Sequence, residues 1–184
     1  MAFKSFKIGK YTIEKPIVQG GMGVGISWDQ LAGNVSKEGG LGVISAVGTG
    51  VYKNRKFLHN NEMVGKEHRP LDAINFYSYP ALKKIFDNAR EICGDKPLAA
   101  NVIYAQSEYN REVADACKAG ANIIITGAGL PLTMPEATKY YPDFALVPIV
   151  STAKELKILC RRWKYTHDRR PFAVIVEGPL SGGH

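Results

Sequence analysis

The sequence predicts an α/β fold in which short buried strands alternate with helices around a parallel sheet. Apolar runs of strand length carry this prediction, at 16–19, 41–45, 97–103, 122–126, 145–150 and 172–176. Segments with the apolar spacing of amphipathic helices separate the later runs, at 108–118, 131–139 and 152–166. Continuous apolar runs separated by such segments are typical of parallel strands that are buried on both faces.

Turn and capping residues predict the elements near the amino end. Residues 5–13 have Gly9 near their centre, which favours a small hairpin ahead of the first strand. Ser27 is a good N-cap for a helix over 27–37, because its hydroxyl can accept a hydrogen bond from a free N–H of the first turn.

One segment interrupts the alternation within what we expect to be a single domain over 1–184. Residues 47–79 are too many for a simple strand-to-helix connection. A loop of this length inside a compact domain is usually functional or disordered. We interpret it as an inserted loop with some helix, followed by a helix over 80–92.

Composition excludes several classes of protein. The chain is 45% hydrophobic and 22% charged, which is ordinary for a globular domain. No apolar run reaches the roughly 18 residues that span a bilayer, and residues 1–11 lack the apolar core of a secretory signal. We therefore expect a cytoplasmic protein without a membrane span. The cysteines Cys93, Cys117 and Cys160 lack metal-ligand spacing, so we expect no metal site.

The net charge of +7 has its densest source in residues 161–170. A basic cluster can bind nucleic acid, but no nucleic-acid-binding motif accompanies this one. We interpret it as a solvated helix face and the turn after it, and we expect no nucleic-acid partner.

Glycine-bearing turns follow three of the predicted strands, at 19–23, 126–129 and 177–184. The carboxyl ends of parallel strands meet at one edge, where α/β proteins build their sites. A glycine there lets the backbone approach a flat ring or a phosphate closely. The spacing of glycines at 21–25 does not fit G-x-G-x-x-G, and no P-loop motif occurs, so both nucleotide fingerprints are poor.

Several segments together resemble a known family. The run PIVQGGMGVGISWDQLAGNVSKEGGLGVIS, with PLAANVIYA, IIITGAGLP, ALVPIVST and VIVEGPLSGGH after it, is similar to the nitronate monooxygenases and to the related flavin-dependent enoyl-acyl-carrier-protein reductases. The resemblance covers nearly the whole chain apart from 47–79. It implies a TIM-type (β/α)8 barrel that binds FMN, of which this chain supplies roughly the first six β/α units.

The resemblance also implies residue roles. His184 matches the catalytic histidine, and Tyr109 matches an aromatic residue on the substrate side in some relatives. The positions that match cofactor-binding residues are Gly20, Gly21, Met22, Asn101, Thr126, Gly127, Glu177, Gly182 and Gly183. Without the resemblance, Asn101 is equally well explained as a partner of buried backbone groups, and His184 as a frayed terminal residue.

The function that the resemblance implies is FMN-dependent oxidation of nitronates or nitroalkanes by molecular oxygen. One alternative is an NAD(P)H-dependent enoyl-thioester reductase on the same fold. Another is a non-catalytic barrel fragment that needs a partner chain, because strands seven and eight of a barrel are not in this sequence. A second chain or segment that supplies those strands, or a homodimer, is therefore an open expectation.

Overall fold

The computed structural model of the chain describes residues 4–23, 25–49, 52–53, 56–57, 70–178 and 180–181, with the backbone alone at 52–53, 56–57 and 70–77. The strands are β1 (Phe6–Ile8), β2 (Tyr11–Ile13), β3 (Gly42–Ser45), β4 (Tyr52–Lys53), β5 (Lys56–Phe57), β6 (Leu98–Ile103), β7 (Ile123–Gly127), β8 (Ala145–Val150) and β9 (Ile175–Val176). The helices are α1 (Asp29–Lys37), α3 (Pro70–Cys93), α4 (Tyr109–Ala119), α5 (Met134–Ala137) and α6 (Ala153–His167).

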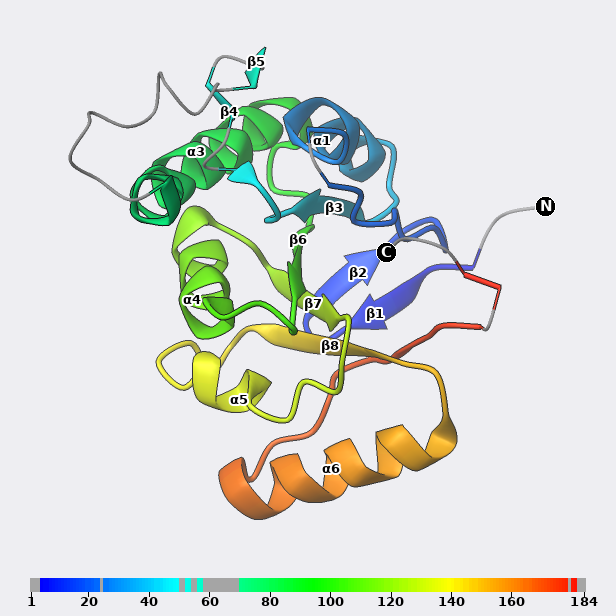
Figure 1. Cartoon of the computed structure of the whole chain (residues 1–184). Coiled ribbons are helices and arrows are strands. Elements are labelled where there is room, and N and C mark those ends of the chain that lie inside the picture. Colours follow the sequence, from blue (N-terminus) through cyan, green and yellow to red (C-terminus); the bar gives the residue numbers. More distant parts are fainter. Residues whose placement is uncertain are drawn as a thin grey trace.

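The central sheet confirms the predicted parallel α/β arrangement. Its five strands lie in the order β3-β6-β7-β8-β9, and every neighbouring pair is parallel. The order of the strands in space follows their order in the chain. The sheet curves as half of a barrel, and the helices lie in an arc outside it (Figure 1). The run at 16–19, expected as a full strand, contributes only one bridge, between Val18 and Leu41.

The two faces of the sheet bury different sets of side chains. Alternate residues of a strand point to opposite faces. On the inner face, Leu41, Val43, Ala99, Ile123, Ile125, Ala145 and Val147 form one cluster with the hairpin residues Ile8 and Ile13. On the outer face, Ile44, Ala100, Val102, Ile124 and Leu146 form a second cluster with the helices. The inner face is therefore a packed barrel interior.

The predicted hairpin closes the amino end of this interior. Strands β1 and β2 pair antiparallel and turn at Gly9, which has a φ of +59° that a glycine adopts without strain. A Cβ at Gly9 would lie 3.2 Å from the ring of Phe172 and 3.6 Å from Ala145. The turn therefore packs directly beneath β8 and the segment before β9.

Several details differ from the sequence predictions. The strand expected at 172–176 covers only Ile175–Val176, and the helix expected at 131–139 covers only Met134–Ala137. The N-cap of α1 is Trp28 and makes no side-chain capping bond, so Ser27 is not the cap. Its hydroxyl instead contacts the preceding glycine segment. Helix α3 begins at Pro70 rather than at 80, and Pro80 lies inside it. In the inserted segment, β4 and β5 form a short antiparallel pair, while 50, 51, 54, 55 and 58–69 lie outside the described residues.

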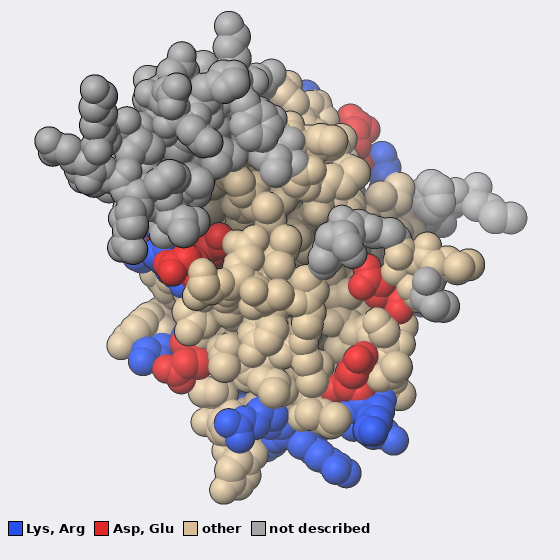
Figure 2. Space-filling model, in the orientation of Figure 1, with Lys and Arg blue, Asp and Glu red and all other residues tan. Residues whose placement is uncertain are grey.

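Helix α6 carries much of the basic charge on an exposed face. Figure 2 shows Lys and Arg side chains gathered over this helix. The side chains of Leu159 and Trp163 are fully buried, whereas Arg161, Arg162 and Lys164 are exposed. The basic cluster thus lies on an exposed helix face, and the absence of a nucleic-acid partner stays a prediction.

Candidate functional site

The carboxyl ends of the parallel strands, here called the carboxyl rim, bring polar residues to the inner face. Ser45 ends β3 and lies in register with Asn101 of β6. Two residues earlier on the same strands, Val43 and Ala99 belong to the inner cluster. Because side chains alternate along a strand, Ser45 and Asn101 also face the barrel interior. The inner face thus changes from apolar to polar at the rim.

The glycine segment Gly20–Met22 lies against Asn101. A Cβ at Gly21 would be 2.4 Å from the Cβ of Asn101, 2.6 Å from its Cγ and 2.9 Å from its Oδ1. No side chain fits at that distance, so only glycine permits this backbone to approach the amide. Met22 follows with 44% of its surface exposed. The structure therefore brings together four of the residues expected at the cofactor site.

Two polar side chains at this place have no partner in the part of the chain that the structure describes. The side-chain amide of Asn101 makes no hydrogen bond to any described residue, although its backbone carbonyl accepts one from Ala46 at 3.0 Å. The Oγ of Ser45 is buried and also lacks a described partner. Buried polar groups are nearly always hydrogen-bonded, so the hydroxyl of Ser45 indicates a position where a polar ligand adds a partner, and the half-buried amide of Asn101 is its neighbour in the register of the sheet.

At the end of β7, the expected site residues Thr126 and Gly127 face opposite sides of the sheet. Gly127 faces inward, where a Cβ would lie 2.9 Å from the Cδ1 of Ile149. Thr126 faces outward and is fully buried, and its Oγ1 lies 3.3 Å from the hydroxyl of Tyr109. Only the backbone of Thr126 is thus available to a ligand at the rim.

Tyr109, expected on the substrate side, lies in the core between α4 and the outer face of the sheet. It is 5% exposed, and burial raises the pKa of its hydroxyl. The aromatic residue at the rim is Tyr104, whose ring packs edge-on against Tyr109 with centroids 4.9 Å apart. Tyr104 also touches the turn after β7, since a Cβ at Gly129 would lie 3.0 Å from its ring. The structure does not bring Tyr109 to the inner face.

The end of the chain is described only in part. Glu177 follows β9, is exposed, and donates its N–H to the carbonyl of Val150 at 2.9 Å. Gly182, Gly183 and His184 lie outside the described residues, so their expected roles stay predictions. Within the described residues, no group of His, Cys, Asp and Glu could hold a metal ion. Among the described helices, none is both long and apolar enough to cross a membrane.

One carboxyl group near the rim has a strongly shifted pKa. Burial raises the pKa of Glu112, in the first turn of α4, to about 7; Arg111 opposes the shift, and Asp115 and Glu108 add to it. With its amide nitrogen turned toward Glu112, Gln106 donates to the two carboxylate oxygens at 3.0 and 2.7 Å. Glu112 lies on the helix side of the sheet, apart from Asn101.

Sequence reasoning missed three residues that belong to this site. Ser45 had no motif of its own, and its burial becomes visible only when β3 and β6 are in register. Gln19 lay within the glycine turn but was not singled out. Ser27 was interpreted as a helix cap. A polar residue at an inward position of an otherwise apolar strand end is the signal that could have identified Ser45.

A half-barrel with glycine segments at its carboxyl rim, and with an amide there that has no partner in the described part of the chain, is typical of ligand-binding (β/α)-barrel proteins. The chain belongs to the nitronate monooxygenase family, whose model matches residues 4–184. This match confirms the resemblance inferred from the sequence.

Two solved structures show the same fold. FabK from Thermotoga maritima is 26% identical, with a TM-score of 0.65 over 94% of this chain and 43% of that chain. Nitroalkane oxidase from Streptomyces ansochromogenes is 18% identical, with a TM-score of 0.57 over 96% of this chain and 49% of that chain. The chain thus spans less than half of either structure. Comparison with curated proteins finds no match.

Proposed function

We propose that this chain forms the FMN-binding part of an oxidoreductase that oxidises nitronates or nitroalkanes with molecular oxygen. One observation carries the proposal: the side-chain amide of Asn101, which has no hydrogen-bond partner among the described residues, lies against the backbone of Gly21 at the inner edge of the rim. A flat ring can lie close to the backbone of Gly21 because glycine has no Cβ. The amide of Asn101 can donate and accept hydrogen bonds, so it suits a ring with donors and acceptors along its edge. The isoalloxazine of FMN has that chemistry.

The residues around Asn101 suit different parts of such a ring. Gly20 and Gly21 give it backbone contact, and Met22 gives it an exposed apolar side chain. The buried hydroxyl of Ser45 faces the same interior. Gly127, Gly182, Gly183 and Glu177 are proposed to border the cofactor from the later turns. When bound, FMN would supply the redox chemistry between substrate and oxygen, and the residues named above would bind and orient it.

His184 is proposed as the catalytic residue. A histidine has an ordinary pKa of about 6.5, so near neutrality it can accept a proton from the carbon next to a nitro group or hydrogen-bond a nitronate. General acid–base catalysis typically contributes roughly 10²–10⁴-fold. In the full-length protein, His184→Asn should retain flavin and lose turnover by about that factor. Turnover within a few-fold of the parent would show that His184 is not catalytic.

The similarity to FabK supports a second candidate, reduction of an enoyl thioester by NADH or NADPH. Steady-state assays with the purified full-length protein separate the two functions. We expect oxygen consumption with the nitronate of 2-nitropropane and no oxidation of NADH by an enoyl thioester. The opposite pattern would favour the reductase.

Variants of two asparagines test whether the flavin binds at Asn101. Asn101→Ala should lower flavin affinity because it removes the unpartnered amide. Asn34→Ala is the matched control, since Asn34 is exposed on α1 and bonds only the carbonyl of Gln30 at 2.8 Å. Equal flavin affinity in both variants would remove Asn101 from the site.

A further inference from the structure

Two side chains behind the glycine segment hold its backbone in place. Backbone pairing at this edge of the sheet reaches Gln19, whose N–H donates to the carbonyl of Leu41 at 3.0 Å. The side chain of Gln19 then continues the ladder. Its Nε2 donates to the carbonyl of Val43 at 3.1 Å, and its Oε1 accepts from the N–H of Val43 at 3.4 Å. A primary amide carries the same donor and acceptor as a peptide group, so it occupies the position that the backbone leaves.

Ser27 fixes the backbone of Gly20–Met22, which follows Gln19 and no longer pairs with the sheet. Its side chain is fully buried. Its Oγ donates to the carbonyl of Gly20 at 3.0 Å, and it accepts from the N–H of Met22 at 2.9 Å and from the Nε2 of Gln19 at 2.9 Å. A serine hydroxyl has one donor and two lone pairs, so all of them are used. The backbone of Ser27 adds bonds to Met22 and Ser45, at 3.0 and 2.9 Å.

These bonds determine which polar groups remain for a ligand. The N–H and carbonyl of Met22 and the carbonyl of Gly20 are bonded to Ser27. The N–H and carbonyl of Gly21 make no hydrogen bond within the described residues. They lie next to Asn101, whose side-chain amide is likewise unpartnered there. Among the described residues, the groups that remain free beside Asn101 therefore include the N–H and carbonyl of Gly21 and the side-chain amide of Asn101 itself.

We propose that Gln19 and Ser27 are positioning residues that hold Gly20–Met22 against Asn101 for a flat heteroaromatic ligand. The identity of that ligand as a flavin rests on the proposed function. Neither side chain needs to touch the ligand. Loss of the Ser27 hydroxyl would leave the N–H of Met22 without its partner and let the segment move away from Asn101.

The test compares two fully buried serines in the full-length protein. Ser27→Ala removes the bonds to the glycine segment. Ser36→Ala is the matched control, because the Oγ of Ser36 donates to the carbonyl of Pro97 at 2.7 Å and accepts from the N–H of Gly42 at 2.9 Å, away from the rim. Both should lower the melting temperature. Gln19→Glu, which loses the Nε2 donor and keeps an acceptor, is the second variant.

Two quantities are measured, hydrogen exchange of peptide 19–27 in flavin-free protein and the Kd for FMN. For Ser27→Ala and Gln19→Glu, we expect faster exchange and a Kd about tenfold higher or more, as the loss of bonds to a buried group implies. Ser36→Ala should change neither by more than about twofold. If the parent binds FMN, the proposal is overturned when the exchange rate or the Kd of Ser27→Ala and Gln19→Glu stays within twofold of the value for Ser36→Ala.

The failure of the proposed function is distinguishable from this result. If the parent binds no FMN, the proposed function fails, and the exchange measurement alone decides the positioning role. Faster exchange confined to peptide 19–27 then supports the positioning role, and unchanged exchange overturns it.

Discussion

Ser45 and Ser36 are both fully buried, yet among the described residues only the hydroxyl of Ser36 has hydrogen-bond partners. The hydroxyl of Ser36 is hydrogen-bonded to two backbone groups, whereas that of Ser45 has no partner among the described residues. Leaving a buried polar group unsatisfied costs about 1–3 kcal/mol. A protein keeps such a group where function requires it. The difference between these two serines therefore distinguishes the site from the rest of the core at the scale of a single residue.

Ser45→Ala should stabilise the flavin-free protein. Removal of the unpartnered hydroxyl should raise the free energy of unfolding by about 1 kcal/mol, while Ser36→Ala should lower it by a similar amount. Urea unfolding of the flavin-free full-length variants measures both. If Ser45→Ala is destabilised as much as Ser36→Ala, the hydroxyl of Ser45 has a partner and is not available to a ligand.

Glu112 should make the stability depend on pH. Its pKa is raised to about 7 by burial, so the folded protein holds this proton more tightly than the unfolded chain does. The stabilisation is fully present below the unfolded pKa of about 4.3 and is lost as the pH rises through 7. Glu112→Gln should therefore raise stability at pH 8, by about 1 kcal/mol after allowance for solvent screening, and change little at pH 4.

Unfolding curves at pH 4 and pH 8 test this expectation. Glu38→Gln is the control, because Glu38 is exposed and its ion pair with Lys15 spans 3.6 Å. A gain at pH 8 that Glu38→Gln reproduces, or an equal gain at both pH values, would contradict a buried carboxyl at Glu112.

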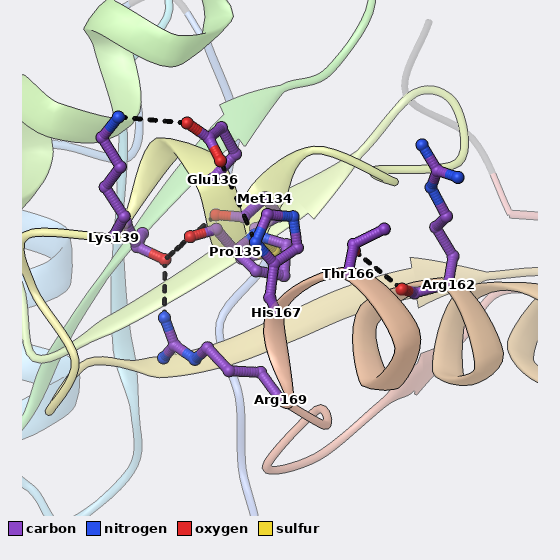
Figure 3. Close-up of polar contacts among 9 residues, drawn as sticks. Met134, Pro135, Glu136, Lys139, Arg162, Thr166, His167 and Arg169 are labelled. Carbon is purple, nitrogen blue, oxygen red and sulfur yellow. Dashed lines mark hydrogen bonds and ion pairs between the residues drawn. The ribbon is translucent and has the colours of Figure 1, made fainter.

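At the scale of elements, one arginine joins the segments that enter β8 and β9. Arg169 follows α6 and donates to the Oγ1 of Thr138 at 2.9 Å. Figure 3 shows the side chain of Arg169 pointing toward the segment that carries Glu136 and Lys139. Arg169 also donates to the carbonyls of Pro142 and Phe144, at 3.3 and 3.2 Å. Thr138 in turn donates to the carbonyl of Met134 at 3.0 Å. These bonds tie the end of α6 to the loop between α5 and β8, at the opposite end of the strands from the carboxyl rim.

Arg169→Ala should destabilise the protein without changing flavin binding. Three carbonyl or hydroxyl oxygens lose a charged donor, which predicts a loss of about 1–3 kcal/mol in unfolding free energy. Arg170→Ala is the matched control, since the neighbouring side chain is exposed. Equal stability of the two variants would show that the Arg169 bonds contribute nothing.

The spacing of apolar residues predicted the buried strands and helices well, because the pattern within each segment is enough to indicate its secondary structure. The runs predicted at 97–103, 122–126 and 145–150 are the strands β6, β7 and β8 to within one residue, and α6 begins with the capping box of Thr152 and Glu155. The start of α3 could not be predicted, because Pro80 is a favoured first residue of a helix and the tertiary context overrides that preference.

The site was predictable only in part, for a different reason. Gly21 and Asn101 are eighty positions apart, and only the register of the sheet makes them neighbours. The role of Ser27 depends on where the Gln19–Met22 backbone runs after it leaves the sheet. A serine before a helix usually caps it, and the competing hydrogen bonds to Gly20 and Met22 are visible only in three dimensions.

At the scale of the whole molecule, apolar side chains are exposed at both edges of the half-barrel. Strand β9 ends one edge of the sheet, and Val176 is 74% exposed there. At the other edge, Ile17 and Val18 are 52% and 41% exposed beside the bridge to Leu41. Unpaired strand edges with apolar side chains favour association. We propose that further β/α units, from the same chain or a second one, pair with both edges.

A polypeptide of only these 184 residues should therefore not behave as a flavin-binding monomer. The apolar area that further units would cover is worth about 25 cal/mol per Å², and domains are stable by only about 5–15 kcal/mol. Light scattering after size exclusion should show association, and co-expression of the further β/α units proposed above should give a monodisperse species. A monodisperse yellow monomer that melts cooperatively would contradict this expectation.

The central claim is that the carboxyl rim around Gly21 and Asn101 binds FMN, and one measurement tests it most directly. The full-length protein is purified and denatured, and the released chromophore is identified by chromatography, alongside the Gly21→Ala variant. A methyl group at Gly21 would overlap Asn101, since its carbon would lie 2.4 Å from the Cβ of that residue. We predict FMN in a one-to-one ratio from the parent and little or none from Gly21→Ala. Release of FAD, no flavin from a reconstituted parent, or equal FMN from both proteins would contradict the account.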